Sequence, residues 1–307
     1  MATISVQNSG ERLDSFLASE ISDFSRAQIK QAIEAGEVTV NGSVCTKAGR
    51  KLVMGDVVAW DVPEIPEDDI IPHAESGIDF RVVYEDAHII VVDKPTGLVV
   101  HPGAGNLHGT LIQGLLEKYP EIAAVGEPER PGIVHRIDSG TSGLLVIARS
   151  QAAYEALVRM FAAHEVHRQY WAICYGPKLP DCGRFDTPYG RHPTQRVKYS
   201  SKFDAPKRAV TNYRVAARNA QGFILVTCLL ETGRTHQVRV HLSDHNSPIL
   251  GDSLYAPEKL AKHKAIGRLA LHAQRLEFEH PVTGAHCAFE APFPDDFLNA
   301  LNVLGLK

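Results

Sequence analysis

The sequence predicts an α+β protein with a small N-terminal module and a larger domain built on a mixed, largely antiparallel sheet. Its 307 residues suffice for two domains, and 44% hydrophobic and 22% charged residues are usual for a globular chain. Residues 63–79 are acidic and rich in proline, as in a linker, so the expected parts are 1–62 and 80–307. The larger part holds many β-prone runs and few helical ones, without the alternation of a parallel sheet.

The small module reads as two helices followed by short strands. Ser25 and Gln28 have the spacing of a capping box at the start of the second helix. Asn41-Gly42 between two β-prone runs predicts a hairpin. The expected elements are a helix over 13–19, a helix from Ser25 to Gly36, a strand over 38–40 and a strand near 57–60.

The larger domain is expected to contain eight strands and four helices, assigned by apolar periodicity and turn residues. The strands are expected over 81–84, 89–92, 144–148, 168–174, 210–216, 222–230, 274–279 and 286–290, and the helices over 110–118, 151–163, 235–244 and 294–302.

Charge is unevenly distributed along the chain. The whole chain has a net charge of −4, yet residues 163–241 carry 13 Lys and Arg against 5 Asp and Glu. A local basic surface is what a polyanion-binding protein needs, although a solvated face without a partner fits the charge equally well. No apolar run approaches membrane-helix length, and we expect no secretory signal because the first residues lack a basic region followed by an apolar core. Five scattered cysteines without a Cys-x-x-Cys pair favour the cytoplasm and argue against disulfides or a zinc ribbon.

The densest cluster of reactive side chains runs from Gly132 to Gly143. Asp138 stands there on a Gly/Ser/Thr loop before an apolar strand, where a carboxylate can meet a ligand. The spacing differs from the His-Arg-Asp motif of kinases, the Gly-x-Ser-x-Gly elbow of hydrolases and the phosphate loop. An ordinary structural alternative is that Asp138 caps a turn and pairs with Arg136.

Three further clusters stand out. Arg234 follows Gly233 in the expected first turn of a helix, where the dipole disfavours a cation, so we expect it to have an anionic partner. His241 and His245 lie four residues apart, but no acidic residue completes a metal site at a known spacing. Arg168 and Tyr170 share one face of a strand, and the run 92–102 reads as a hairpin.

The small module resembles the S4 RNA-binding domain. The matching residues are Arg12-Leu13-Asp14, Ser25-Arg26, the run from Gly36 to Gly42, and Leu52 with Gly55-Asp56. The resemblance implies that the second helix and the following loop contact RNA. The implied phosphate contacts are Arg12, Arg26, Lys30 and Lys47.

The four clusters of the larger domain together resemble the RluA/RluD family of pseudouridine synthases. The family's His-Arg-Leu-Asp-x-x-Thr-Ser-Gly motif matches residues 135–143, with Ile137 for Leu. Its Lys-x-Tyr motif matches 168–170, with Arg168 for Lys. The remaining matches are Lys-Pro-x-Gly-x-x-Val-His at 94–101, Gly-Arg-Thr-His-Gln-Val-Arg-Val-His at 233–241 and Leu-His-Ala at 271–273. Details such as the runs 188–193 and 208–213 look closest to the RluD branch.

This resemblance implies an isomerisation of uridine in RNA that needs no cofactor and no metal. It implies that Asp138 acts on the nucleotide, as nucleophile or as base, that Arg234 pairs with Asp138, and that Tyr170 packs on the uracil and serves as base for the C5 proton. Arg136 would fill the space that the flipped base leaves. The other implied RNA contacts are His135, Thr141, Leu271 in the pocket wall, Arg191, Arg196 and Lys198.

The expected partner is large-subunit ribosomal RNA, free or in a pre-50S particle, and the RluD-like details favour the helix 69 stem-loop of 23S RNA. Other ribosomal sites and tRNA stay open. Rival functions are an S4-type RNA-binding protein without activity and an RNA methyltransferase, for which neither a methyl-donor site nor a catalytic Cys near a Pro is evident. We expect a cytoplasmic monomer without a membrane partner.

Overall fold

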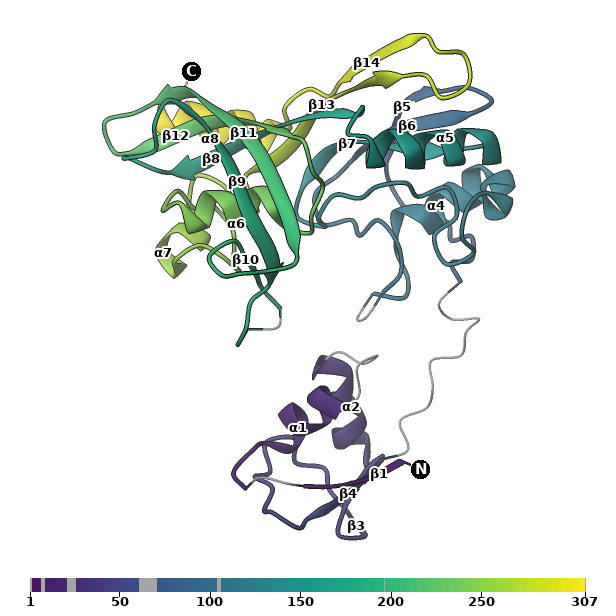
Figure 1. Ribbon diagram of the computed structural model, residues 1–307, viewed down its shortest axis with the longest axis vertical. Helices are drawn as coiled ribbons and strands as arrows, with labels where there is room; N and C mark the ends of the chain where they lie inside the picture. The colour runs from purple at the N-terminus through teal and green to yellow at the C-terminus, as the bar shows by residue number, and fades with distance from the viewer. Residues whose placement is uncertain are drawn as a thin grey trace. The chain divides into compact units, whose positions relative to one another are not determined.

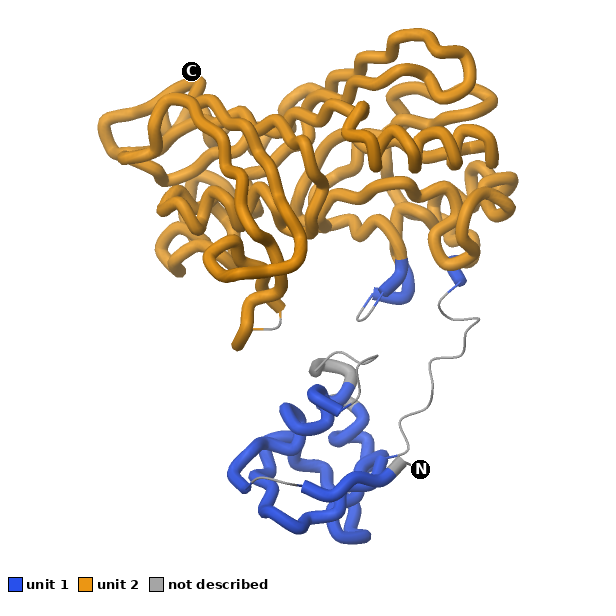
Figure 2. The backbone as a smooth tube through the Cα atoms, in the orientation of Figure 1, with its two compact units in different colours: residues 1–72, 102–108 blue, residues 73–101, 109–307 orange. Residues whose placement is uncertain are grey.

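The computed structural model describes residues 2–6, 9–20, 26–60, 71–103, 106–195 and 197–306, without the side chains of 2, 26–28 and 31. The chain divides into two compact units (Figure 2). The first unit contains residues 1–72 and 102–108, and the second contains 73–101 and 109–307.

The first unit packs two helices and an antiparallel four-stranded sheet in the order β1-β4-β2-β3. Its hairpin turn at Asn41-Gly42 is confirmed, with φ of 54° and 78°, the left-handed conformation that such a turn requires. The expected capping residue Ser25 lies outside the described residues. The elements are β1 (Ala2–Ser5), α1 (Leu13–Glu20), α2 (Arg26–Ala35), β2 (Val38–Val40), β3 (Ser43–Val44) and β4 (Val57–Trp60).

The second unit is built on a ten-stranded sheet (Figure 1). The order is β10-β9-β11-β12-β8-β13-β7-β6-β5, with β14 paired to β13, and every pairing is antiparallel except β13 with β7. The mixed, largely antiparallel α+β class is therefore confirmed. The strands are β5 (Arg81–Glu85), β6 (Ile89–Lys94), β7 (Ser142–Ala148), β8 (His167–Tyr175), β9 (Cys182–Arg191), β10 (Tyr199–Ser200), β11 (Lys207–Arg218), β12 (Phe223–Leu230), β13 (Leu271–Glu279) and β14 (His286–Glu290).

Helices cover both faces of this sheet. The helical elements are α4 (Leu111–Lys118), the 3-10 helix η1 (Pro120–Ala124), α5 (Gln151–Ala162), α6 (Gln237–Asp244), α7 (Glu258–Ala261) and α8 (Asp295–Leu304). Within the described part of the chain, every helix is too short or too polar to cross a membrane.

Strand β7 is buried along its whole length. Leu145 and Ile147 face a core that includes Leu115 of α4 and Phe297 of α8, whereas Leu144 and Val146 face a second core with Leu157 of α5. Burial on both faces explains why this strand is a continuous apolar run rather than an alternating one. The loop that carries Asp138 leads directly into this fixed strand.

Candidate active site

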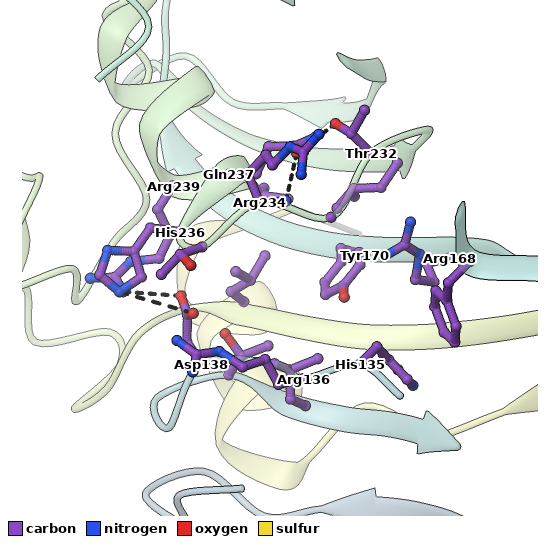
Figure 3. A pocket seen from close by; sticks show the side chains of 18 of the residues that line it. His135, Arg136, Asp138, Arg168, Tyr170, Thr232, Arg234, His236, Gln237 and Arg239 are labelled. Atoms are coloured by element: carbon purple, nitrogen blue, oxygen red, sulfur yellow. Dashed lines mark hydrogen bonds and ion pairs between the residues drawn. The ribbon is translucent and has the colours of Figure 1, made fainter. Parts of the chain in front are cut away.

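A cavity of about 650 Å³ opens in the second unit. The loop before β7, strand β8, the loop between β12 and α6, and the start of β13 all contribute to its wall (Figure 3). Seven of the residues expected to act in catalysis or to contact RNA line this cavity, although they are up to 136 positions apart. They are His135, Arg136, Asp138, Thr141, Tyr170, Arg234 and Leu271.

The loop that carries Asp138 is held by the turn after β6. Lys94 is fully buried, and its Nζ donates to the carbonyl oxygens of Pro95 (2.8 Å), Leu98 (2.8 Å) and Ser139 (3.1 Å). The backbone N–H of Gly97 also donates to the carbonyl of Ser139, at 2.8 Å. The run 92–102 that reads as a hairpin in the sequence thus fixes the backbone next to Asp138.

The Asp138 carboxylate is bound by Arg239 of α6. Arg239 Nη1 donates to Asp138 Oδ2 at 3.0 Å, and His236 Nε2 lies 4.0 Å from Oδ1. The expected pairing of Asp138 with Arg234 is therefore wrong. Burial disfavours the charge on Arg239, but hydrogen bonds and charge from Asp252 and Asp138 outweigh burial and raise the pKa of Arg239.

Asp252 fixes the orientation of Arg239 from behind. Its two carboxylate oxygens accept from Arg239 Nε (2.8 Å) and Nη2 (2.9 Å), a bidentate pair that holds the guanidinium plane. Asp252 is itself fully buried and accepts from the backbone N–H groups of Leu254 and Tyr255. The arrangement Asp252–Arg239–Asp138 presents one carboxylate to the cavity in a defined orientation.

Arg234 takes a different place because α6 starts two residues later than expected. His236 adopts φ 60°, and Gln237 Oε1 accepts from the backbone N–H of Arg234 at 3.0 Å. The Arg234 side chain is exposed, and its Nε donates to the carbonyl of Arg208 at 3.2 Å. Arg234 is thus a cation on the cavity rim rather than the partner of the carboxylate.

Tyr170 and Leu271 supply the apolar part of the wall. Both are buried, and they come from the neighbouring strands β8 and β13. Burial raises the pKa of Tyr170, so its phenol stays protonated at neutral pH.

Two other motif residues are built into the framework of the loop. His135 Nε2 accepts from the backbone N–H of Val146 at 3.0 Å, and burial lowers its pKa to about 3, so the imidazole is neutral. Thr141 is buried, and its Oγ1 is without a hydrogen-bond partner among the described residues. Arg136, in contrast, is exposed at the cavity, and its Nη1 lies 3.2 Å from His101 Nε2.

The cavity is strongly positive although the chain as a whole is acidic. Its charged lining consists of one carboxylate, Asp138, and five arginines. Such a lining attracts an anionic ligand, and Asp138 lies among the cationic groups that would bind that ligand. The arginines are Arg130, Arg136, Arg168, Arg234 and Arg239.

The remaining expected RNA contacts lie elsewhere. Arg191 lines a neighbouring cavity with Arg234, and Lys198 lies 6.0 Å from the ring of Tyr255. Arg196 and the side chain of Arg26 lie outside the described residues. In the first unit, Arg12 forms a bidentate pair with Asp14 (3.0 and 2.9 Å), Lys30 lies 3.5 Å from Glu34, and Lys47 is exposed.

Sequence reasoning missed Arg239, His236 and Asp252 as members of the site. Arg239 and His236 lie in the motif at 233–241, and a helix starting at Gln237 would have placed Arg239 in its first turn, facing inward. Asp252 stands in an irregular segment after Gly251, and no local pattern marks it.

Comparisons with known proteins give matches along nearly the whole chain. The family model described as RNA pseudouridylate synthase matches residues 88–244, and the S4 domain model matches residues 11–58. An uncharacterized RNA pseudouridine synthase of Bacillus subtilis, YlyB, is 42% identical over 98% of this chain and 97% of its own length. Ribosomal large subunit pseudouridine synthase D of Yersinia pestis is 41% identical over 99% of this chain and 94% of its own. The structure of human RNA Pseudouridylate Synthase Domain Containing 4 matches with a TM-score of 0.57 at 26% identity, over 74% of this chain and 93% of that one.

Proposed function

The chain belongs to the RNA pseudouridylate synthase family and is an RNA pseudouridine synthase, and from this premise we propose that it modifies uridines of large-subunit ribosomal RNA in the helix 69 stem-loop. Relatives of nearly the same length are named for the large ribosomal subunit. We further propose that Asp138 is the group that reacts with the nucleotide, in a cytoplasmic monomer.

The observation that carries the role of Asp138 is that, among the described residues, it is the only carboxylate lining a cavity that also has five arginines in its wall. Arg239, itself held by Asp252, binds Asp138 Oδ2, and His236 Nε2 lies 4.0 Å from Oδ1, so the carboxylate is fixed in the wall of the cavity that a nucleotide would enter. A glycosidase uses two carboxylates and admits water. An isomerisation that keeps the base needs one carboxylate and an apolar wall that excludes water. Tyr170 and Leu271 provide that wall.

The reaction breaks the N1–C1′ bond, turns the uracil and forms a C5–C1′ bond. C5 loses a proton and N1 gains one, so atoms balance without a co-reactant. Asp138 acts on the nucleotide either as nucleophile or as base, and the neutral Tyr170 ring supports the turning base. Removing the uridine from its stack costs on the order of a few kcal/mol, which is least in a loop. Arg136, exposed beside Asp138, fills the vacated position.

The rest of the RNA is expected to follow the basic surface around the cavity. Arg191 and Lys198 flank it, with Arg196 in the same segment. The S4 unit adds Lys30 and Lys47, which are exposed, and Arg12 and Arg26 are the other phosphate contacts that we propose in this unit.

The first prediction is tested by pseudouridine mapping on total RNA from cells with and without this chain, using carbodiimide adducts and reverse-transcriptase stops. Wild type and Asp138→Asn are reintroduced at matched expression. We expect the helix 69 stops to vanish without the chain and to return with wild type only, because the amide has neither the charge nor the basicity of the carboxylate.

Other outcomes separate the parts of the proposal. Stops that vanish at another ribosomal site or in a tRNA would keep the chemistry and overturn the helix 69 assignment. Full rescue by Asp138→Asn would overturn the role of Asp138. Stops that persist without the chain would favour the RNA-binding function alone.

A further inference from the structure

Arg168 is a buried cation to which the described residues offer no anionic partner. It lies on β8, and only 8% of its surface is exposed. Its Nε is buried without a hydrogen-bond partner, and within the described parts of the chain its guanidinium makes no ion pair. Its guanidinium packs on the ring of Phe161, with Cζ 5.3 Å from the ring centre.

Two acidic side chains that line a cavity together with Arg168 are bound to other cations. Glu231 accepts from both Nη atoms of Arg184 and from Asn212, and Glu277 accepts from Arg275. A buried charge without a counter-ion is costly, and burial lowers the pKa of Arg168 accordingly. A buried guanidinium without a counter-ion is typical of a site that binds an anionic ligand.

Arg168 stands where two cavities meet. It lines the active-site cavity and also a second cavity of about 470 Å³, and Leu230 is the other residue that lines both. Its guanidinium lies against Gly233, where a Cβ atom would come within 2.5 Å of Nη1. Figure 3 shows Arg168 beside Tyr170 on the same strand, on the side of the cavity away from Asp138.

We propose that Arg168 forms a phosphate subsite for the RNA phosphodiester next to the target uridine. This inference rests on the proposed function. RNA carries one negative charge per nucleotide, and a planar guanidinium binds phosphate oxygens through paired N–H donors. A uracil carbonyl is neutral and would leave the buried charge uncompensated. The site therefore binds the backbone while Tyr170, two residues along, packs on the base.

The first test compares Arg168→Met and Arg168→Lys with wild type on an RNA fragment that contains the mapped uridine. We expect Arg168→Met to raise KM by about tenfold with a smaller change in kcat, and to reduce the salt slope of RNA binding by about one. Arg168→Lys should lie between this variant and wild type. Arg214→Met removes an exposed arginine of β11 that lines neither cavity, and it should leave KM unchanged.

Thermal stability separates binding from a structural role. Because the substrate-free protein loses an unpaired buried charge, Arg168→Met should melt at the same temperature as wild type or higher. A lower melting temperature together with an unchanged KM would overturn the subsite and make Arg168 a packing residue.

The second test removes a negative charge from the RNA instead of the positive charge from the protein. Methylphosphonates are placed singly at the two phosphodiesters that flank the target uridine. At one of the two positions, the methylphosphonate should lower the kcat/KM of wild type by about the factor that Arg168→Met lowers it on native RNA. The same methylphosphonate should lower the kcat/KM of Arg168→Met little further, because the interaction is already lost. Additive losses at both positions would overturn the proposal. If wild type forms no pseudouridine, the proposed function fails, and filter binding of the same RNAs still decides on Arg168: equal affinities of wild type and Arg168→Met overturn it.

Discussion

At the scale of single residues, the site depends on how one guanidinium is held. Arg239 is fixed by two bonds to Asp252 and offers its remaining Nη1 to Asp138. Without Asp252, Arg239 would keep its charge but lose the plane that orients the reacting carboxylate. Small displacements of a reacting group cost on the order of 10² in rate.

Asp252→Asn is therefore predicted to lower kcat by about 10–100-fold with a smaller change in KM. Release of tritium from C5-labelled RNA under single-turnover conditions measures this loss. Asp181→Asn breaks an exposed pair with Arg218 and should leave the rate unchanged. A rate for Asp252→Asn equal to that of wild type would show that Asp138 needs no such support.

The sequence identified Asp138 but not its partner, and the reason is local geometry. Arg234 and Arg239 belong to the same motif, and its spacing does not tell which of them faces inward. The left-handed His236 delays the start of α6, which turns Arg234 outward and Arg239 toward Asp138. A single backbone angle thus decided a feature that the residue pattern left open.

At the scale of elements, α6 is tied to the sheet by a neutral histidine. His241 is fully buried, and its ring nitrogens lie 3.0 Å from Thr187 Oγ1 of β9 and 2.9 Å from Thr211 Oγ1 of β11. Burial lowers its pKa to about 4. Between about pH 6.5 and 4 the unfolded chain binds a proton there that the folded protein does not, so stability falls as the pH falls.

This linkage predicts a slope of about 1.4 kcal/mol per pH unit from His241 in that window. Urea unfolding of wild type and His241→Asn at several pH values measures it. The variant should be less stable at pH 7 but show a flatter dependence between pH 6.5 and 4. The exposed His286→Asn serves as control and should keep the wild-type slope. Parallel curves for wild type and His241→Asn would contradict the prediction.

Strands with an alternating or continuous apolar pattern were predictable, whereas β9 was not. All eight expected strands of the larger domain are present within a few residues, as are its four expected helices. Strand β9 contains Gly183, Pro188 and Gly190, which normally end strands, and forms through its pairing with β11. Its register is a tertiary effect that no local pattern encodes.

At the scale of the whole molecule, the two units have separate hydrophobic cores. The core of the first unit draws on residues between Val6 and Val58, and the cores of the second unit draw on residues from Ile89 onward. We therefore predict two unfolding transitions in calorimetry. Leu13→Ala should lower one midpoint and Leu145→Ala the other, each through a cavity costing about 2–5 kcal/mol. A single transition shifted by both variants would contradict this.

The seam between β13 and β7 has a consequence for the protein as a whole. These strands pair in parallel at His272–Ser142 and Ala273–Gly143, and Gly143 packs so closely on the Ala273 backbone that a side chain would not fit. Asp138 precedes β7 on one side of this seam, whereas Tyr170, Arg239 and Leu271 belong to the other side. A shift of the β13–β7 register by one residue would separate Asp138 from the residues on the other side. Catalytic activity therefore reports whether β13 and β7 have paired in the correct register, since a chain paired in the wrong register would be inactive.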